Sequence, residues 1–124
     1  MKVILLAIVF SIFLSSCREI KEREYQLFQL STTSDSAAYH YQSGWQEIMD
    51  YGNYSKAEME WRKAKSYDKR FLLNLAVLAR VTQNTDERLI LTKELERRKD
   101  ELSGDERAVL DIYLALTHYT NFRD

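Results

Sequence analysis

The sequence predicts an all-α fold of about five helices that pair as antiparallel hairpins. The 124 residues contain no proline and only three glycines, which suits long helices better than a turn-rich β structure. Apolar residues recur at steps of three and four along most of the second half of the chain, as they do on one face of an α-helix. The length suffices for one domain, which we place at residues 37–121.

The first 16 residues have the parts of a secretory signal peptide. Lys2 precedes an apolar run over residues 3–14 that only Ser11 interrupts, and small residues follow. A membrane-spanning helix needs roughly 20 apolar residues, so this run is short for a permanent span. We therefore predict a cleaved signal peptide over residues 1–16, with an uncleaved membrane-associated tail as the alternative.

The segment Leu14-Ser15-Ser16-Cys17 resembles the lipobox of bacterial lipoproteins. The resemblance implies that the Cys17 thiol carries a diacylglycerol, that the new amino terminus is acylated as well, and that the chain is anchored in the cell envelope. Several acyl chains give stable anchoring, at about 0.8 kcal/mol per buried methylene. Because Arg18 stands where an aspartate signals inner-membrane retention in some Gram-negative lipoproteins, the resemblance favours the outer membrane. Cys17 is the only cysteine, so an internal disulfide or a cysteine metal cluster is excluded.

Residues 17–36 form the predicted tether between the anchor and the domain. Charges alternate from Arg18 to Glu24, and the polar run from Ser31 to Ser36 cannot bury much surface. A flexible stalk is one interpretation. The other is a short helix or strand that docks on the domain through its apolar residues, which are Tyr25, Leu27, Phe28 and Leu30.

The first helix of the body is predicted from about Ser36 to Tyr51. Serine, threonine and aspartate at positions 33–36 suit the N-cap, because their side chains accept hydrogen bonds from first-turn amides. One face carries Tyr41, Trp45 and Ile48. Gly52 suits a left-handed residue after the helix, and Asn53 can cap the next one.

The second helix lies within residues 52–68 and places five apolar residues on one face: Tyr54, Ala57, Trp61, Ala64 and Tyr67. The order Gly-Asn-Tyr, Lys-Ala, an aromatic residue, a second Lys-Ala and a final Asp resembles the second helix of a tetratricopeptide repeat. Gly44, Ala76 and Ala108 lie 32 residues apart, near the period of about 34 in that family. The resemblance implies a short right-handed solenoid of two and a half repeats that binds proteins or peptides.

The third helix follows Asp68, which can cap it, and is apolar on nearly every side from Phe71 to Val81, as expected at the centre of a domain. A fourth helix, from about Asp86 to Leu102, buries only four residues: Leu89, Leu91, Leu95 and Leu102. On its solvent side we expect two ion pairs, Glu94 with Arg98 and Arg97 with Glu101.

A capping box at residues 103–106 starts the fifth helix, which runs over about 105–121 and is apolar all round. Three explanations for its apolar surface stay open. The chain is the front of a longer repeat protein, a partner or second copy covers the helix, or the tether folds over it.

The sequence offers little that supports catalysis. His40 and His118 are the only histidines and lie in different predicted helices, and no nucleophile elbow, phosphate loop or His-Glu-x-x-His motif occurs. A formal charge of −1 gives no basic excess for nucleic acid. We therefore expect no enzyme, no cofactor and no metal site.

The tetratricopeptide resemblance implies a partner groove on the inner face of the first helices. Its predicted residues are Tyr39, Gln42, Gln46, Met49, Phe71, Asn74, Leu78 and Val81. Alternatively, Tyr39, Phe71 and Leu78 are core residues. The expected function is a lipid-anchored, non-catalytic adaptor that binds a protein or peptide in the cell envelope, with homo-oligomers possible. The alternative is the front segment of a larger lipoprotein whose active or sensory part lies beyond residue 124.

Overall fold

The computed structural model describes residues 29–120, and side chains up to Thr117. The helices are α2 (Asp35–Tyr51), α3 (Tyr54–Tyr67), α4 (Leu72–Val81), α5 (Thr85–Arg98) and α6 (Gly104–Thr120), with a 3₁₀ turn, η1 (Lys99–Glu101), after α5. No strand occurs in residues 29–120, so the all-α prediction is confirmed for this part of the chain. The predicted signal peptide, Cys17 and most of the tether lie outside the described residues.

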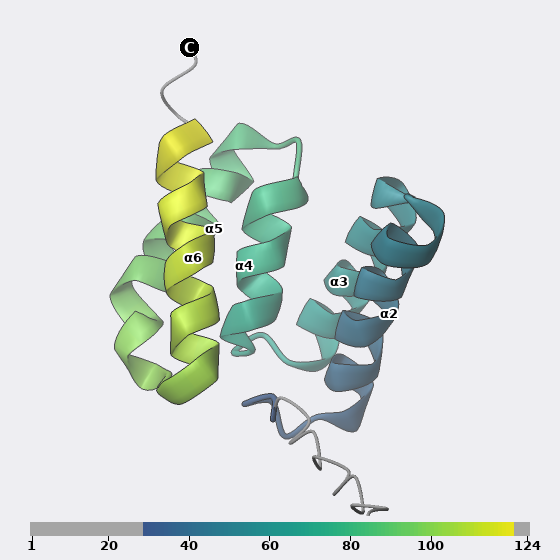
Figure 1. Ribbon diagram of the computed structural model, residues 1–124, viewed down its shortest axis with the longest axis horizontal. Coiled ribbons are helices and arrows are strands. Elements are labelled where there is room, and N and C mark those ends of the chain that lie inside the picture. Colours follow the sequence, from purple (N-terminus) through teal and green to yellow (C-terminus); the bar gives the residue numbers. More distant parts are fainter. Residues whose placement is uncertain (1–28, 121–124) are drawn as a thin grey trace, which may run out of the picture.

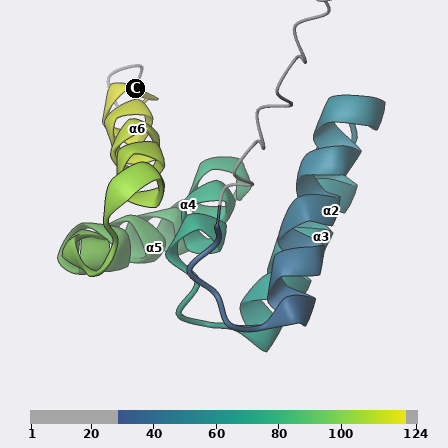
Figure 2. The ribbon, with the colours of Figure 1, turned by 60° about the horizontal axis from the view of Figure 1, so that its bottom comes forward.

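Helices α2 and α3 form an antiparallel hairpin whose ends are set by local signals (Figures 1 and 2). The Ser34 hydroxyl accepts a hydrogen bond from the Ala37 amide at 3.2 Å, and the Asn53 side chain accepts one from the Lys56 amide at 3.1 Å. Gly52 ends α2 with a φ of 63°, in the left-handed region that glycine adopts without strain. The predicted boundaries of this hairpin are thereby confirmed.

Trp61 and Gly44 fit together at the centre of the hairpin. Trp61 is fully buried, and its indole nitrogen donates to the Tyr41 carbonyl oxygen at 3.1 Å. A Cβ atom on Gly44 would lie only 2.3 Å from Trp61 Nε1, so the ring occupies the space that a side chain would need. Trp45 adds an edge contact to the Trp61 ring at 5.4 Å between centroids.

The predicted apolar face of α3 is confirmed in its middle and wrong at its ends. Ala57, Trp61 and Ala64 are buried, whereas Tyr54 is 64% exposed and Tyr67 57% exposed. At a helix terminus fewer neighbouring turns can close over a large ring, and a tyrosine hydroxyl is stable in water.

Helix α4 lies between the α2–α3 hairpin and α5 with α6, as Figure 2 shows. Every residue from Leu72 to Ala79 is buried, which confirms the predicted central helix. The predicted N-cap at Asp68 is wrong. A helix capped by Asp68 would begin at residue 69, whereas α4 begins at Leu72, and its N-cap residue, Phe71, makes no side-chain hydrogen bond to the helix. The Asp68 carboxylate instead accepts hydrogen bonds from the Arg70 amide at 2.8 Å and the Thr32 hydroxyl at 2.6 Å.

Of the four leucines predicted to be buried by the fourth helix, three are buried: Leu91, Leu95 and Leu102. Leu102 lies just beyond η1. Leu89 is 53% exposed, because two residues of helix turn it about 200° away from Leu91. The Glu94–Arg98 ion pair is confirmed at 2.9 Å, but Arg98 is buried rather than on the solvent side.

The predicted ion pair between Arg97 and Glu101 does not form in the described structure. That carboxylate binds Arg98 at 2.8 Å and lies 3.9 Å from Arg70.

The described end of the tether docks on the domain without forming a helix or strand. Leu30 packs against the core, and the Ser31 amide donates to Glu106 Oε1 at 2.8 Å. With the Thr32–Asp68 hydrogen bond, this short segment joins the first turn of α6 to the α3–α4 connection. Tyr25, Leu27 and Phe28 lie outside the described residues.

None of the helices between residues 29 and 120 combines the length and apolar character needed to cross a bilayer.

Candidate functional site

The eight predicted groove residues do not form one surface. Four lie on the exposed face of α2: Tyr39, Gln42, Gln46 and Met49. Phe71, Asn74 and Leu78 are buried in the core, and Val81 is half-buried. The alternative assignment to the core is therefore confirmed for Phe71 and Leu78 and wrong for Tyr39, which is 65% exposed.

The structure instead places a cleft between the α2–α3 hairpin, α4 and α6. It has a volume of about 140 Å³ and is lined mainly by aromatic and aliphatic side chains: Trp45, Ile48, Tyr54, Trp61, Val77, Arg80, Val81 and Tyr113. A second hollow of about 400 Å³ shares Tyr54, Arg80 and Val81 with it and adds Ser55, Glu58 and Gln83. We call the two together the cleft.

Of the predicted groove residues, only Val81 lines the cleft. Trp45 and Ile48 were identified in the sequence as a packing face of the first helix, and this face provides the wall on α2. Arg80 and Tyr113 carried no signal of their own, because their neighbours in the cleft come from distant parts of the chain.

The smaller hollow of the cleft is mainly apolar and holds one exposed cation. Arg80 is exposed and forms no ion pair with any acidic residue of the described part of the chain. Burial raises the pKa of Tyr113 to about 12, so its hydroxyl is neutral at physiological pH. The cleft thus offers apolar surface, one guanidinium, the phenols of Tyr54 and Tyr113, and the polar side chains of Ser55, Glu58 and Gln83.

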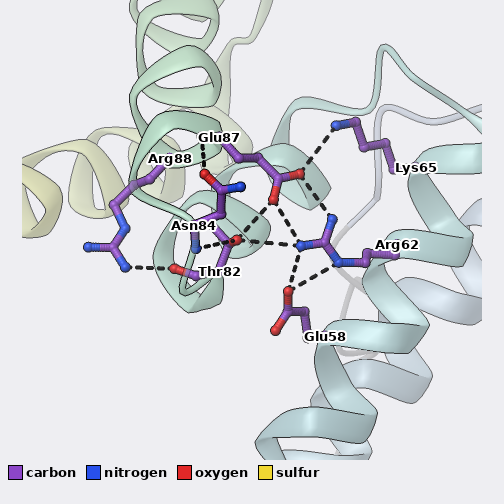
Figure 3. Close-up of polar contacts among 7 residues, drawn as sticks. All are labelled: Glu58, Arg62, Lys65, Thr82, Asn84, Glu87 and Arg88. Carbon is purple, nitrogen blue, oxygen red and sulfur yellow. Dashed lines mark hydrogen bonds and ion pairs between the residues drawn. The ribbon is translucent and has the colours of Figure 1, made fainter.

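An ion-pair network lies beside the cleft and connects α3 to the α4–α5 loop and the first turn of α5 (Figure 3). Arg62 lies between two carboxylates, at 2.6 Å from Glu58 and 2.9 Å from Glu87. Glu87 also accepts a hydrogen bond from the Thr82 hydroxyl at 2.9 Å. Hydrogen bonding from Arg62 is the main cause that lowers the pKa of Glu87 to about 2. Glu58 lines the cleft, but its charge is already compensated by Arg62.

His40 is part of a contact between α2 and α3. Its Nδ1 lies 2.6 Å from Glu60 Oε2, and its ring stacks on Tyr67 with centroids 5.4 Å apart. Glu60 also pairs with Lys63 at 2.6 Å. The geometry is that of a structural contact between two helices. The side chain of His118 lies outside those described.

Within the described residues, no three histidine, cysteine, aspartate or glutamate side chains group closely enough to hold a metal ion.

The chain matches no family model, no curated protein and no solved structure.

Proposed function

We propose that this chain is a lipid-anchored, non-catalytic interaction module of the bacterial cell envelope, which binds an extended peptide segment of a partner protein in the cleft. Acyl chains on Cys17 provide the anchor, with the outer membrane favoured. The helices stack as a short right-handed solenoid of the tetratricopeptide type. The lipobox resemblance supports the anchor, and the order of packing, in which α3 and α6 both contact α4, supports the stacking.

The observation that carries the binding proposal is the composition of the cleft. Four helices contribute side chains to it, and three of them provide its four aromatic residues: Trp45, Tyr54, Trp61 and Tyr113. Apolar pockets with a few polar groups are typical of sites that hold a partner's side chains. Helical grooves grip peptides through such anchors.

A random peptide library, panned against the full chain purified in detergent, tests this proposal. Tyr54→Ala removes an exposed cleft ring, and Tyr51→Ala removes a similarly exposed ring from the end of α2 that does not line the cleft. We expect selected peptides to lose at least tenfold in affinity for Tyr54→Ala and to bind Tyr51→Ala normally. Equal binding to both variants contradicts a role for the cleft.

The anchor is tested separately by cell fractionation. With Cys17→Ala we expect the protein to leave the membrane fraction, because the acyl chains have lost their attachment point. A Ser16→Ala control keeps a small residue before Cys17 and is expected to stay with the membrane. Unchanged membrane association of Cys17→Ala counts against acylation.

A second candidate is the front segment of a larger lipoprotein, and the surface of α6 favours it. Ala108, Ile112 and Ala115 are exposed on one side of this helix, where a further hairpin would find an apolar face. Sedimentation of the purified chain separates the candidates. A stable monomer argues against a missing neighbour, whereas self-association supports one.

A further inference from the structure

A third hollow lies between α4, α5 and α6 and shares Arg80 with the cleft. Its volume is about 180 Å³, and it is lined by Ala79, Arg80, Arg88, Leu116 and Thr117. Among the described residues, the lining holds two guanidinium groups and no acidic side chain. We call it the arginine hollow.

The two arginines of the hollow differ from three other arginines of the described chain, which are paired with acids. Arg62, Arg98 and Arg107 each contact two carboxylates, with closest distances of 2.6, 2.8 and 2.7 Å. Neither Arg80 nor Arg88 forms an ion pair with a described acid. Two uncompensated cations in one concave place favour an anion.

Arg88 is held in position before any ligand arrives. Its Nη2 donates to the Thr82 carbonyl oxygen at 2.6 Å, while its buried Nε has no hydrogen-bond partner. Figure 3 shows the Arg88 guanidinium on the opposite side of Thr82 from Glu58 and Glu87. The nearby acids of the ion-pair network therefore face Arg62, and they leave Arg88 uncompensated.

We infer that the arginine hollow binds a carboxylate of the same segment whose apolar side chain occupies the cleft. Arg80 lines both places, so a carboxylate one or two residues from an apolar anchor would reach it. Planar guanidinium groups match carboxylates by paired hydrogen bonds. This inference rests on the proposed function and specifies its partner: a peptide with a bulky apolar residue beside an aspartate, a glutamate or its own C-terminal carboxylate.

Three small probes test the inference by NMR on the full chain in detergent, with empty micelles as the partition control. Acetyl-Leu-Phe has a terminal carboxylate, acetyl-Leu-Phe-amide has none, and acetyl-Phe-Asp-amide has a side-chain carboxylate. We expect all three to shift the signals of Val77, Val81 and the Trp45 indole. Only the two probes that carry a carboxylate, acetyl-Leu-Phe and acetyl-Phe-Asp-amide, should shift the Nε–H signals of Arg80 and Arg88. These two should also bind at least tenfold tighter than acetyl-Leu-Phe-amide.

Arg80→Gln should abolish this tenfold preference, and Arg80→Lys should restore part of it. Arg97→Gln, which removes an exposed arginine of α5 outside the hollow, should keep it. Arg80 is the better position to change, because Arg88 also holds the Thr82 carbonyl.

Each outcome bears on a different claim. Equal binding of acid and amide at the cleft overturns the arginine hollow and leaves the proposed function intact. The absence of any shift in the cleft overturns both. A preference for acetyl-Leu-Phe over acetyl-Phe-Asp-amide assigns the carboxylate to a chain terminus, and the reverse assigns it to a side chain.

Discussion

The α2–α3 hairpin and the α4–α6 half are both helical, but they are held together in different ways. In the hairpin, one large ring fits against the bare backbone of one glycine, where a Cβ on Gly44 would come within 2.3 Å of Trp61. In the other half, eight consecutive residues of α4 are buried, and leucines of α5 and α6 pack against them.

The difference teaches where the fold depends on shape and where it depends on buried apolar area. A ring that fills the place of a side chain tolerates no added atom, since protein interiors are close-packed. A leucine-rich core accepts side chains of similar volume at small cost. Substitutions can therefore separate the two halves.

The largest effect is expected in the hairpin. Trp61→Leu should reduce the free energy of unfolding by about 3–4 kcal/mol through the cavity it leaves. Gly44→Ala alone should be destabilising by about 1–2 kcal/mol, because overpacking outweighs the roughly 1 kcal/mol that alanine gains in a helix. In the Trp61→Leu background, Gly44→Ala should become stabilising. Urea unfolding of the native chain, the two single variants and the double variant measures this change of sign. If the free-energy changes of the two substitutions simply add, the proposed steric fit is wrong.

The next effect is expected at Asn74, which joins the halves. Its side-chain nitrogen donates to the Trp61 carbonyl oxygen at 2.9 Å, and the residue is fully buried. Asn74→Asp should cost about 3 kcal/mol near pH 7, since a carboxylate there faces a carbonyl oxygen without water. Asn74→Ala, the matched control, should cost only about 1–2 kcal/mol. The additional loss of unfolding free energy in Asn74→Asp, relative to Asn74→Ala, should shrink as pH falls and the carboxyl becomes neutral. An additional loss that does not change with pH would contradict this explanation.

A smaller effect is expected from a volume-conserving change in α4. Leu75→Met should reduce the free energy of unfolding by only about 1 kcal/mol, because methionine is flexible and fills a similar space. Thermal or urea unfolding checks this value. A loss comparable to that of Trp61→Leu would show that α4 is as shape-dependent as the hairpin and would remove the contrast.

The smallest effect is expected from the surface network that bridges the halves. The pKa of Glu87 is about 2 in the folded protein, below its ordinary value of 4.5. A depressed pKa stabilises the fold above pH 4.5, and this stability is lost as pH falls from 4.5 towards 2. Solvent screening limits the contribution to about 0.5–1 kcal/mol. Urea unfolding between pH 6 and pH 2.5 should show a steeper loss for the native chain than for Glu87→Gln, and parallel curves would mean that the network contributes nothing.

Local signals in the sequence predicted most of the helix limits correctly. Ser34, Gly52 and Asn53 act within one turn of their own positions, so they need no partner elsewhere in the chain. The burial of α4 was equally predictable, because a helix that is apolar on every side has no face to expose to solvent. Asp68 was the exception, since the docked tether engages its carboxylate.

The candidate site was poorly predictable. Val81 alone of the eight groove residues lines the cleft, because which face of α2 points inward depends on how α4 and α6 pack on the hairpin. The burial of Arg98 had the same kind of cause, since its contact with the Arg70 carbonyl oxygen requires the α3–α4 connection to lie beside α5.

The sequence by itself determined the helical class, most of the helix limits and the central place of α4, because caps and apolar periodicity act over one or two turns. Only the tertiary structure decided that Trp61 fills the space beside Gly44, that Trp45 and Tyr113 share a cleft, and that Arg80 and Arg88 meet without an acid. These contacts join residues 8 to 68 positions apart, and the packing of whole helices brings them together.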